Sequence, residues 1–182
     1  MKNIFLILLS FGLIFQSCSD QKQSIKNIDT IFLNNLNSLD RMYSSLENVI
    51  EGRVVRVKDG DTIVILTSDM QQITIRVKSV DCPERRQPYG KKAKDFVIDQ
   101  IAGKDVRITN TSQDRYGRTI GFVKYKDKDL SEELLKEGLA WHYIKYSKDL
   151  NLQELENQAR KNKIGLWSNP SSIEPWLYRK NN

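Results

Sequence analysis

The stretch GRVVRVKDGDTIVILTSDMQQITIRVKSV, residues 52–80, decides the fold class of this chain. Its apolar and β-branched residues fall into runs at 52–58, 61–67 and 71–80, which predict three β-strands. The last two runs are joined through SDMQ, residues 68–71, a connection rich in turn-forming residues. The Asp-Gly-Asp sequence at 59–61 is also typical of a turn, and these residues alone favour that plain interpretation.

After residue 80 the pattern predicts helices, where apolar residues recur at three- and four-residue steps, and further strands, where they alternate. The predicted helices are 89–103, 129–138 and 151–163, and the predicted strands are 104–112 and 118–125. Asp129 with Glu132, and Asn151 with Glu154, stand in the capping relation that marks helix starts. Five strands with helices after the third and the fifth predict an α+β domain around a small barrel.

The N-terminus is typical of a secretory signal. Lys2 is followed by the almost wholly apolar run 4–15, which as a helix would reach only about 20 Å and is too short to span a bilayer. We therefore predict a signal peptide at 1–17. Cys18 follows the small residue Ser17, an arrangement that resembles the lipobox of bacterial lipoproteins, so Cys18 is the predicted lipidation site. The alternative is an ordinary secreted protein that is cut nearby, with Cys18 an incidental thiol.

Residues 18–50 form a predicted linker with an amphipathic helical stripe, and Asp29 is a candidate N-cap. This segment could pack on the domain or pair with another chain, and we assign it no chemistry. Cys82 is the other cysteine, so lipidation of Cys18 would exclude an intramolecular disulfide. The main predicted domain then covers 51–182.

Positive charge is concentrated in the later part of the chain. The whole sequence carries a formal charge of +6, residues 1–17 carry one lysine and no acid, and residues 18–51 have three basic and five acidic side chains. Residues 52–182 therefore hold +7. Such a charge suits a polyanion or an anionic membrane surface and does not by itself distinguish the two.

Acids and arginines collect at the predicted strand ends and turns. The acids are Asp61, Asp81 and Glu84, and the cations are Arg76 and Arg118. Carboxylates of this kind can bind a hard cation such as Ca²⁺, and a remaining carboxylate can deprotonate water. Two arginines can hold a phosphate through bidentate hydrogen bonds. Surface salt bridges could explain any one of these residues, but not their shared location at strand ends.

Four motifs, VKDGDT, IRVKSVDCPE, DRYGR and KEGLAW, resemble those of the staphylococcal nuclease (thermonuclease) family in order and spacing. The resemblance covers about residues 52–168. It implies an oligonucleotide-binding-type β-barrel of five strands with three helices. It also implies Ca²⁺-dependent hydrolysis of phosphodiester bonds in DNA and RNA.

The resemblance further implies a metal site. Asp61 and Asp81 would be carboxylate ligands of Ca²⁺, and the main-chain carbonyl of Cys82 would be a third ligand. The best-known members have Thr where this chain has Cys82. A thiol there could attract a softer metal, but we interpret Cys82 as a small buried hydrophobe. Gly60 would let the turn aim Asp61, and Asp59 would be structural.

The family motifs also imply roles in catalysis and substrate binding. Glu84 matches the general base, and Arg76 and Arg118 match the pair that stabilises the charged transition state. Arg115 and Tyr116 stand where the family contacts the terminal phosphate and the base.

The remaining aromatic residues and the single histidine allow more than one interpretation. Tyr143 and Tyr146 could stack on bases, although packing is as good an explanation. For His142 we favour packing over catalysis. The tail at 165–180, with two tryptophans, resembles the C-termini of bacterial relatives and is predicted to be a packed strap with a basic end.

These observations favour a membrane-anchored nuclease of the bacterial envelope, with DNA and RNA, single-stranded or frayed, as partners and no obligate protein partner. A second hypothesis is a binding module on the same barrel that holds nucleic acid without cutting it. A third is a basic lipoprotein that binds anionic polymers or a protein through residues 19–50. The third hypothesis does not explain the acids at the strand ends.

Overall fold

The computed structural model describes residues 49–181. The predicted signal peptide, Cys18 and nearly all of the predicted linker lie outside the described residues. Within residues 49–181, no helix is both long and apolar enough to cross a membrane.

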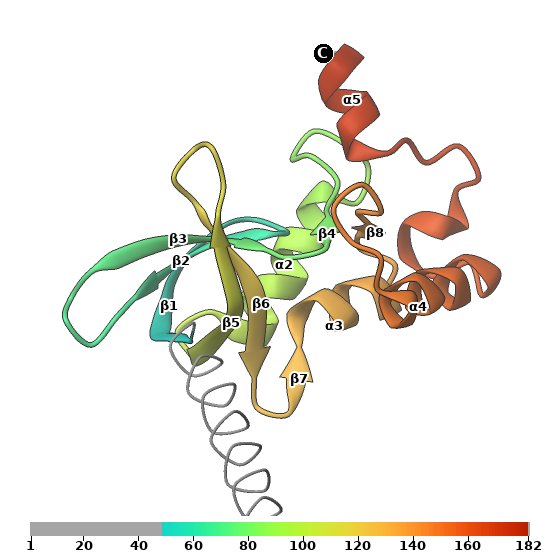
Figure 1. Cartoon of the computed structure of the whole chain (residues 1–182). Helices are drawn as coiled ribbons and strands as arrows, with labels where there is room; N and C mark the ends of the chain where they lie inside the picture. Colours follow the sequence, from blue (N-terminus) through green and yellow to red (C-terminus); the bar gives the residue numbers. More distant parts are fainter. Residues whose placement is uncertain (1–48, 182) are drawn as a thin grey trace, which may run out of the picture. The chain divides into compact units, whose positions relative to one another are not determined.

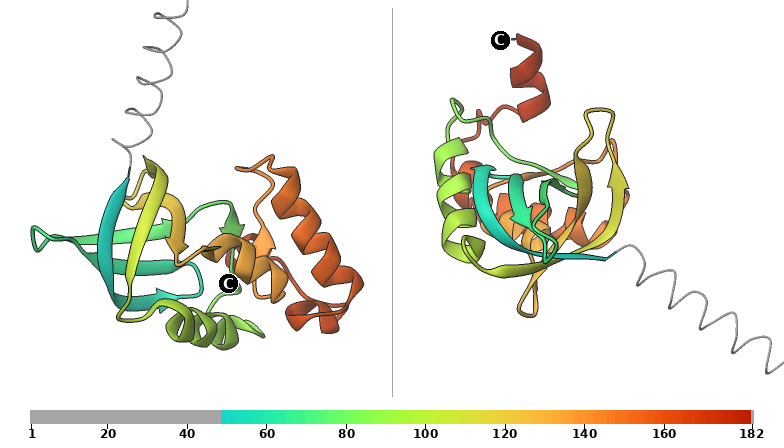
Figure 2. Two further views of the ribbon diagram at one scale, coloured as in Figure 1. Left: turned by 90° about the horizontal axis from the view of Figure 1, so that it is seen from below. Right: turned by 90° about the vertical axis from the view of Figure 1, so that its left-hand side faces the viewer.

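Five strands close into a barrel (Figures 1 and 2), which confirms the predicted α+β class. They are β1 (Ile50–Asp59), β2 (Thr62–Leu66), β3 (Gln72–Val77), β5 (Asp105–Gln113) and β6 (Thr119–Tyr125). Neighbours in the order β3-β2-β1-β5-β6 pair antiparallel, and a parallel pairing of β3 with β6 closes the barrel. The short strands are β7 (Lys128–Asp129), which pairs with β6, and β4 (Val80–Asp81), which pairs with β8 (Trp141–His142).

The three predicted helices are present as α2 (Gly90–Ile101), α3 (Leu130–Lys136) and α4 (Leu150–Lys161). Asp129 caps α3 as predicted, since its side chain accepts hydrogen bonds from the amides of Ser131 and Glu132. For α4 the predicted cap was wrong. Asp149 is the N-cap, and its side chain accepts from the amide of Asn151, which lies inside the helix.

The tail contains two further elements, the 3-10 helix η1 (Gly165–Ser168) and the helix α5 (Pro175–Asn181). The tail, predicted as a packed strap with a basic end, thus includes two short helical elements. Figure 1 shows α5 in dark red beside the loop that joins β4 to α2, and the right-hand view of Figure 2 agrees.

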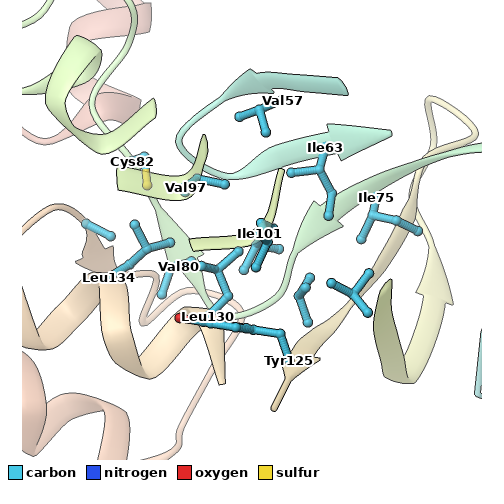
Figure 3. Close-up of a cluster of buried hydrophobic side chains, with 14 of the residues drawn as sticks. Val57, Ile63, Ile75, Val80, Cys82, Val97, Ile101, Tyr125, Leu130 and Leu134 are labelled. Carbon is cyan, nitrogen blue, oxygen red and sulfur yellow. The ribbon is translucent and has the colours of Figure 1, made fainter. Parts of the chain in front are cut away.

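The core lies inside the barrel and beneath α2 and α3 (Figure 3). Buried apolar side chains come from all five barrel strands and from these two helices. Those with no exposed surface include Ile63, Ile75, Ile108, Val123, Val97, Ile101, Leu130 and Leu134. Each such side chain contributes about 1.5–3 kcal/mol of burial free energy, which stabilises the barrel that carries the residues at its rim.

Candidate active site

Arg76 joins two buried acids at one end of the barrel. Its guanidinium nitrogens lie 2.8 Å from Asp61 Oδ2 and 2.7 Å from Asp81 Oδ1. The β2–β3 pairing places Thr62 opposite Arg76, so Asp61, the residue just before β2, comes beside the end of β3. Asp81 lies in β4, shortly after that end. The structure therefore brings together three residues that sequence analysis selected from separate motifs.

The Asp61 carboxylate is held by the backbone as well as by Arg76. The Cys82 amide donates a 2.7 Å hydrogen bond to Asp61 Oδ2, and the Thr62 hydroxyl donates a 3.2 Å bond to Oδ1. Burial raises the pKa of Asp61 to about 7, and Arg76 opposes this effect. Burial also disfavours the charged Arg76, but Asp61 and Asp81 raise the Arg76 pKa above its usual value. A permanent positive charge thus lies between the two acids.

Close packing requires a glycine at position 60. A Cβ at this position would lie 2.8 Å from the Ala93 Cβ and 2.9 Å from the Cys82 Cβ and Sγ. Gly60 is not among the residues with positive φ, so contact with its neighbours, and not a left-handed turn, requires the glycine. Asp59 has the expected structural role, because its Oδ1 accepts a 3.2 Å hydrogen bond from the Asp61 amide. Cys82 is 4% exposed, and burial raises the pKa of its thiol well above the usual value, as expected of a buried hydrophobe.

Glu84 lies on the loop between β4 and α2, and Gln87 shapes that loop. The Glu84 amide donates to Gln87 Oε1 at 2.7 Å, and the Gln87 amide donates to the Glu84 carbonyl at 2.8 Å. A Cβ on Gly90 would lie only 2.0 Å from that carbonyl, so the helix start packs directly on the loop. The Glu84 side chain remains 39% exposed and is accessible at the rim.

Arg179 of α5 contacts Asp81 and Glu84, which was not predicted from the sequence. Its guanidinium lies 2.7 Å from Asp81 Oδ2 and 2.6 Å from Glu84 Oε1. These ion pairs raise the pKa of Arg179 despite the opposing effect of its burial. The only local signal was the basic end of the tail, because Arg179 is separated from these acids by 98 and 95 residues.

Arg118 is near this group but is not in contact with the acids. It precedes β6 and forms a 2.7 Å ion pair with Asp114 in the β5–β6 turn. The β3–β6 register pairs Ile75 with Thr119 and Arg76 with Ile120. Arg118 is therefore adjacent to position 74, and strand alternation places it on the same face of the barrel as Arg76.

The β5–β6 turn also carries the predicted substrate-contacting pair. The Arg115 guanidinium donates a 2.6 Å hydrogen bond to the Tyr116 hydroxyl and lies 4.8 Å from the ring centroid. Tyr116 is 68% exposed, so its ring is available to a ligand.

Tyr143 stacks on Trp176 of α5, with ring centroids 5.2 Å apart and an interplanar angle of 7°. Tyr146 meets Tyr143 edge-on, with ring centroids 4.8 Å apart. His142 is buried and bonded through both ring nitrogens, to Gln153 at 3.0 Å and to Ser147 at 2.8 Å. These contacts agree with the packing role favoured for His142.

The donors present suit a hard cation. Asp61 and Asp81 offer carboxylate oxygens, and cationic guanidinium groups already lie against them. In the part of the chain that the structure describes, no group of three or more His, Cys, Asp or Glu side chains is arranged to hold a metal. A backbone carbonyl would have to complete such a site, as predicted for Cys82.

The structure is a closed five-stranded barrel with paired acids and arginines at its rim, and comparison with known proteins identifies the family. The family model described as staphylococcal nuclease homologue matches residues 74–169. The chain is 41% identical over 131 residues to an uncharacterized endonuclease of Escherichia coli O157:H7, covering 71% of this chain and 85% of that protein. It is 40% identical over 129 residues to an uncharacterized endonuclease of Haemophilus influenzae, covering 70% of this chain and 72% of that protein.

A third similar protein is the micrococcal nuclease of Shigella flexneri, 36% identical over 140 residues, covering 71% of this chain and 80% of that protein. The chain therefore belongs to the staphylococcal nuclease family.

Proposed function

We propose that this protein hydrolyses phosphodiester bonds in DNA and RNA and that the reaction depends on Ca²⁺. The observation that carries the proposal is the bridging of Asp61 and Asp81 by Arg76, with Glu84 on the adjoining loop. Two similar proteins carry the name endonuclease and a third the name micrococcal nuclease, which supports nucleic acid as the substrate.

Asp61, Asp81 and the Cys82 carbonyl would hold the metal. When bound, Ca²⁺ would supply a positive charge that polarises a phosphate oxygen and offsets its negative charge. Glu84 accepts a proton from a water molecule, whose oxygen forms the new bond to phosphorus as the bond to the leaving oxygen breaks, and the leaving oxygen takes a proton from solvent. Arg76 and Arg118 hold the equatorial phosphate oxygens through charge-assisted hydrogen bonds and stabilise the charge of the transition state.

The β5–β6 turn and Tyr143 would bind the rest of the substrate. Arg115 contacts a terminal phosphate, and Tyr116 and Tyr143 offer ring faces on which bases stack. Because stacking needs unpaired bases, single-stranded or frayed nucleic acid is the favoured substrate. The charge of +7 over residues 52–182 provides affinity that is independent of sequence.

The site of action would be the bacterial cell envelope. This part of the proposal rests on the signal-like segment at 1–17 and on Cys18. A lipid on Cys18 would hold the enzyme at a membrane, and without it the protein would be secreted.

The rival is a barrel that binds nucleic acid without cutting it. The presence of all five polar residues, Asp61, Arg76, Asp81, Glu84 and Arg118, favours the enzyme. The test is to incubate labelled single-stranded DNA and RNA with the protein in Ca²⁺ or in chelator, beside the variant Asp81→Asn. We expect cleavage with Ca²⁺ only, and none by the variant. Full cleavage in chelator, or activation by Zn²⁺ and not by Ca²⁺, would overturn the metal assignment.

A further inference from the structure

The Arg179 guanidinium covers the carboxylates that the proposed mechanism needs. Nη2 lies 2.7 Å from Asp81 Oδ2, and Nη1 lies 3.3 Å from Asp81 Oδ1 and 2.6 Å from Glu84 Oε1. Arg76 takes Asp81 Oδ1 as well, so both oxygens of Asp81 are engaged by guanidinium groups. The guanidinium cation on these oxygens repels a divalent cation and competes with water for Glu84 Oε1, so Arg179 opposes both metal binding at Asp81 and proton transfer to Glu84.

The same helix also covers the proposed base-stacking surface. Trp176, three residues before Arg179, lies parallel to the Tyr143 ring at a stacking distance. The indole occupies a ring face of Tyr143 in the way that a nucleobase would. Arg179 thus lies on the acids, where the metal would bind, and Trp176 lies on Tyr143, where a base would stack.

Two further hydrogen bonds hold the segment that precedes α5. Gln87 Nε2 donates to the Ile173 carbonyl at 3.1 Å, and the Tyr89 and Ser168 hydroxyls lie 2.9 Å apart. The Arg179 side chain is 44% exposed and Leu177 is 43% exposed, so α5 contributes little to the core. A short helix whose buried residue is Pro175 alone can detach without unfolding the barrel.

We propose that α5 is an intramolecular inhibitor, which competes with Ca²⁺ through Arg179 and with nucleic acid through Trp176. The inference rests on the proposed function, because it takes Asp81 and Glu84 as the groups that the enzyme needs. Ca²⁺ then binds only the molecules in which α5 is displaced. The apparent Ca²⁺ affinity is therefore the intrinsic affinity multiplied by the fraction of such molecules. The Arg179 guanidinium is partly exposed and makes several charged hydrogen bonds, which together lower the apparent Ca²⁺ affinity about tenfold.

The test measures Ca²⁺ binding by calorimetry on the full-length chain and on Arg179→Gln, with Lys180→Gln as the matched control. Lys180 is the exposed next residue, so its substitution removes the same charge from the same helix. We expect Arg179→Gln to bind Ca²⁺ about tenfold more tightly than the wild type and Lys180→Gln to match the wild type. Arg179→Lys, which keeps the charge and loses the forked geometry, should fall between them.

Hydrogen exchange of the wild type provides a readout that does not depend on activity. Adding Ca²⁺ should raise exchange at the α5 amides several-fold and leave the barrel strands unchanged. Equal Ca²⁺ affinity in wild type and Arg179→Gln would overturn the inhibitor and leave the metal site in place. If neither protein binds Ca²⁺, both the inhibitor and the metal assignment are overturned. Arg179→Gln could also bind the oligonucleotide more weakly than Lys180→Gln does, with unchanged Ca²⁺ affinity. That result would assign Arg179 to substrate binding and overturn the inhibitor.

Discussion

The Cys82 amide donates a 2.7 Å hydrogen bond to Asp61 Oδ2, which ties the β1–β2 turn to the end of β4. This bond holds Asp61 in a buried position beside Arg76. The carboxylate therefore has a fixed orientation, but its burial has an energetic cost that depends on pH.

Stability in chelator should fall as the pH rises from about 4 to about 7, because of Asp61. Its pKa is raised from 3.8 to about 7 in the folded state, so in this window the folded protein retains a proton that the unfolded chain has lost. The contribution of Asp61 is complete below pH 4 and lost above pH 7. Urea unfolding gives the free energy of unfolding of wild type and of Asp61→Asn at several pH values. As the pH rises, the value for the variant should increase relative to that for the wild type. A difference independent of pH would contradict the assignment.

Gly60→Ala should destabilise the protein by about 1–3 kcal/mol, because the new methyl group would overlap Ala93 and Cys82. Ala93→Gly removes one of the overlapping atoms. In the double variant the loss should therefore be smaller than the sum of the two single losses. Thermal or urea unfolding of the four proteins measures this coupling, and strict additivity would show that the contact is not limiting.

His142→Ala should cost about 2–4 kcal/mol of stability, since it removes one buried and one partly buried hydrogen bond and leaves a cavity. Cleavage by the folded fraction at low temperature should stay near the wild-type rate. Comparison of the unfolding midpoint with the cleavage rate separates the two effects. A large loss of rate in a fully folded variant would restore His142 as a catalytic candidate.

Cys18→Ser should release the protein from membranes or leave it unprocessed, because the variant has no thiol to acylate. Fractionation of cells that make wild type and variant measures this directly. Several acyl chains anchor a protein stably where one chain does not. A wild-type protein found wholly in the soluble fraction would refute the anchor without affecting the proposed reaction.

The fold was predictable because its signals are local. Alternating apolar residues define the strands, and Asp129 reaches the amides just after it in the chain. The N-cap of α4 was predicted wrongly, because Asp149 and Asn151 are both good capping residues. The folded geometry selects Asp149.

The site was predictable only in part. The acids and Arg76 lie in recognisable motifs, so their meeting could be expected from the resemblance. The contacts of Arg179 with Asp81 and Glu84 depend on how the tail crosses the barrel, which no local pattern specifies. Gln87 was missed for a similar reason, since its role in shaping the Glu84 loop appears only once the loop is folded.

The most direct test of the proposed reaction compares cleavage and binding in Glu84→Gln and Arg118→Ala, with Arg56→Ala as the control. Arg56 is an exposed arginine on β1, so the control loses the same charge as Arg118→Ala away from the site. The measurement is the cleavage rate of a single-stranded oligonucleotide in saturating Ca²⁺, together with oligonucleotide affinity and melting temperature.

We predict that Glu84→Gln lowers the rate by about 10²–10⁴ and Arg118→Ala by at least about 10²–10³, with little change in melting temperature. Affinity should fall with salt in every variant, because it comes mainly from the distributed positive charge. The control should cut at the wild-type rate. If both variants stay folded and cut as fast as the wild type, or if the wild type binds nucleic acid and never cuts it, the proposed reaction is wrong.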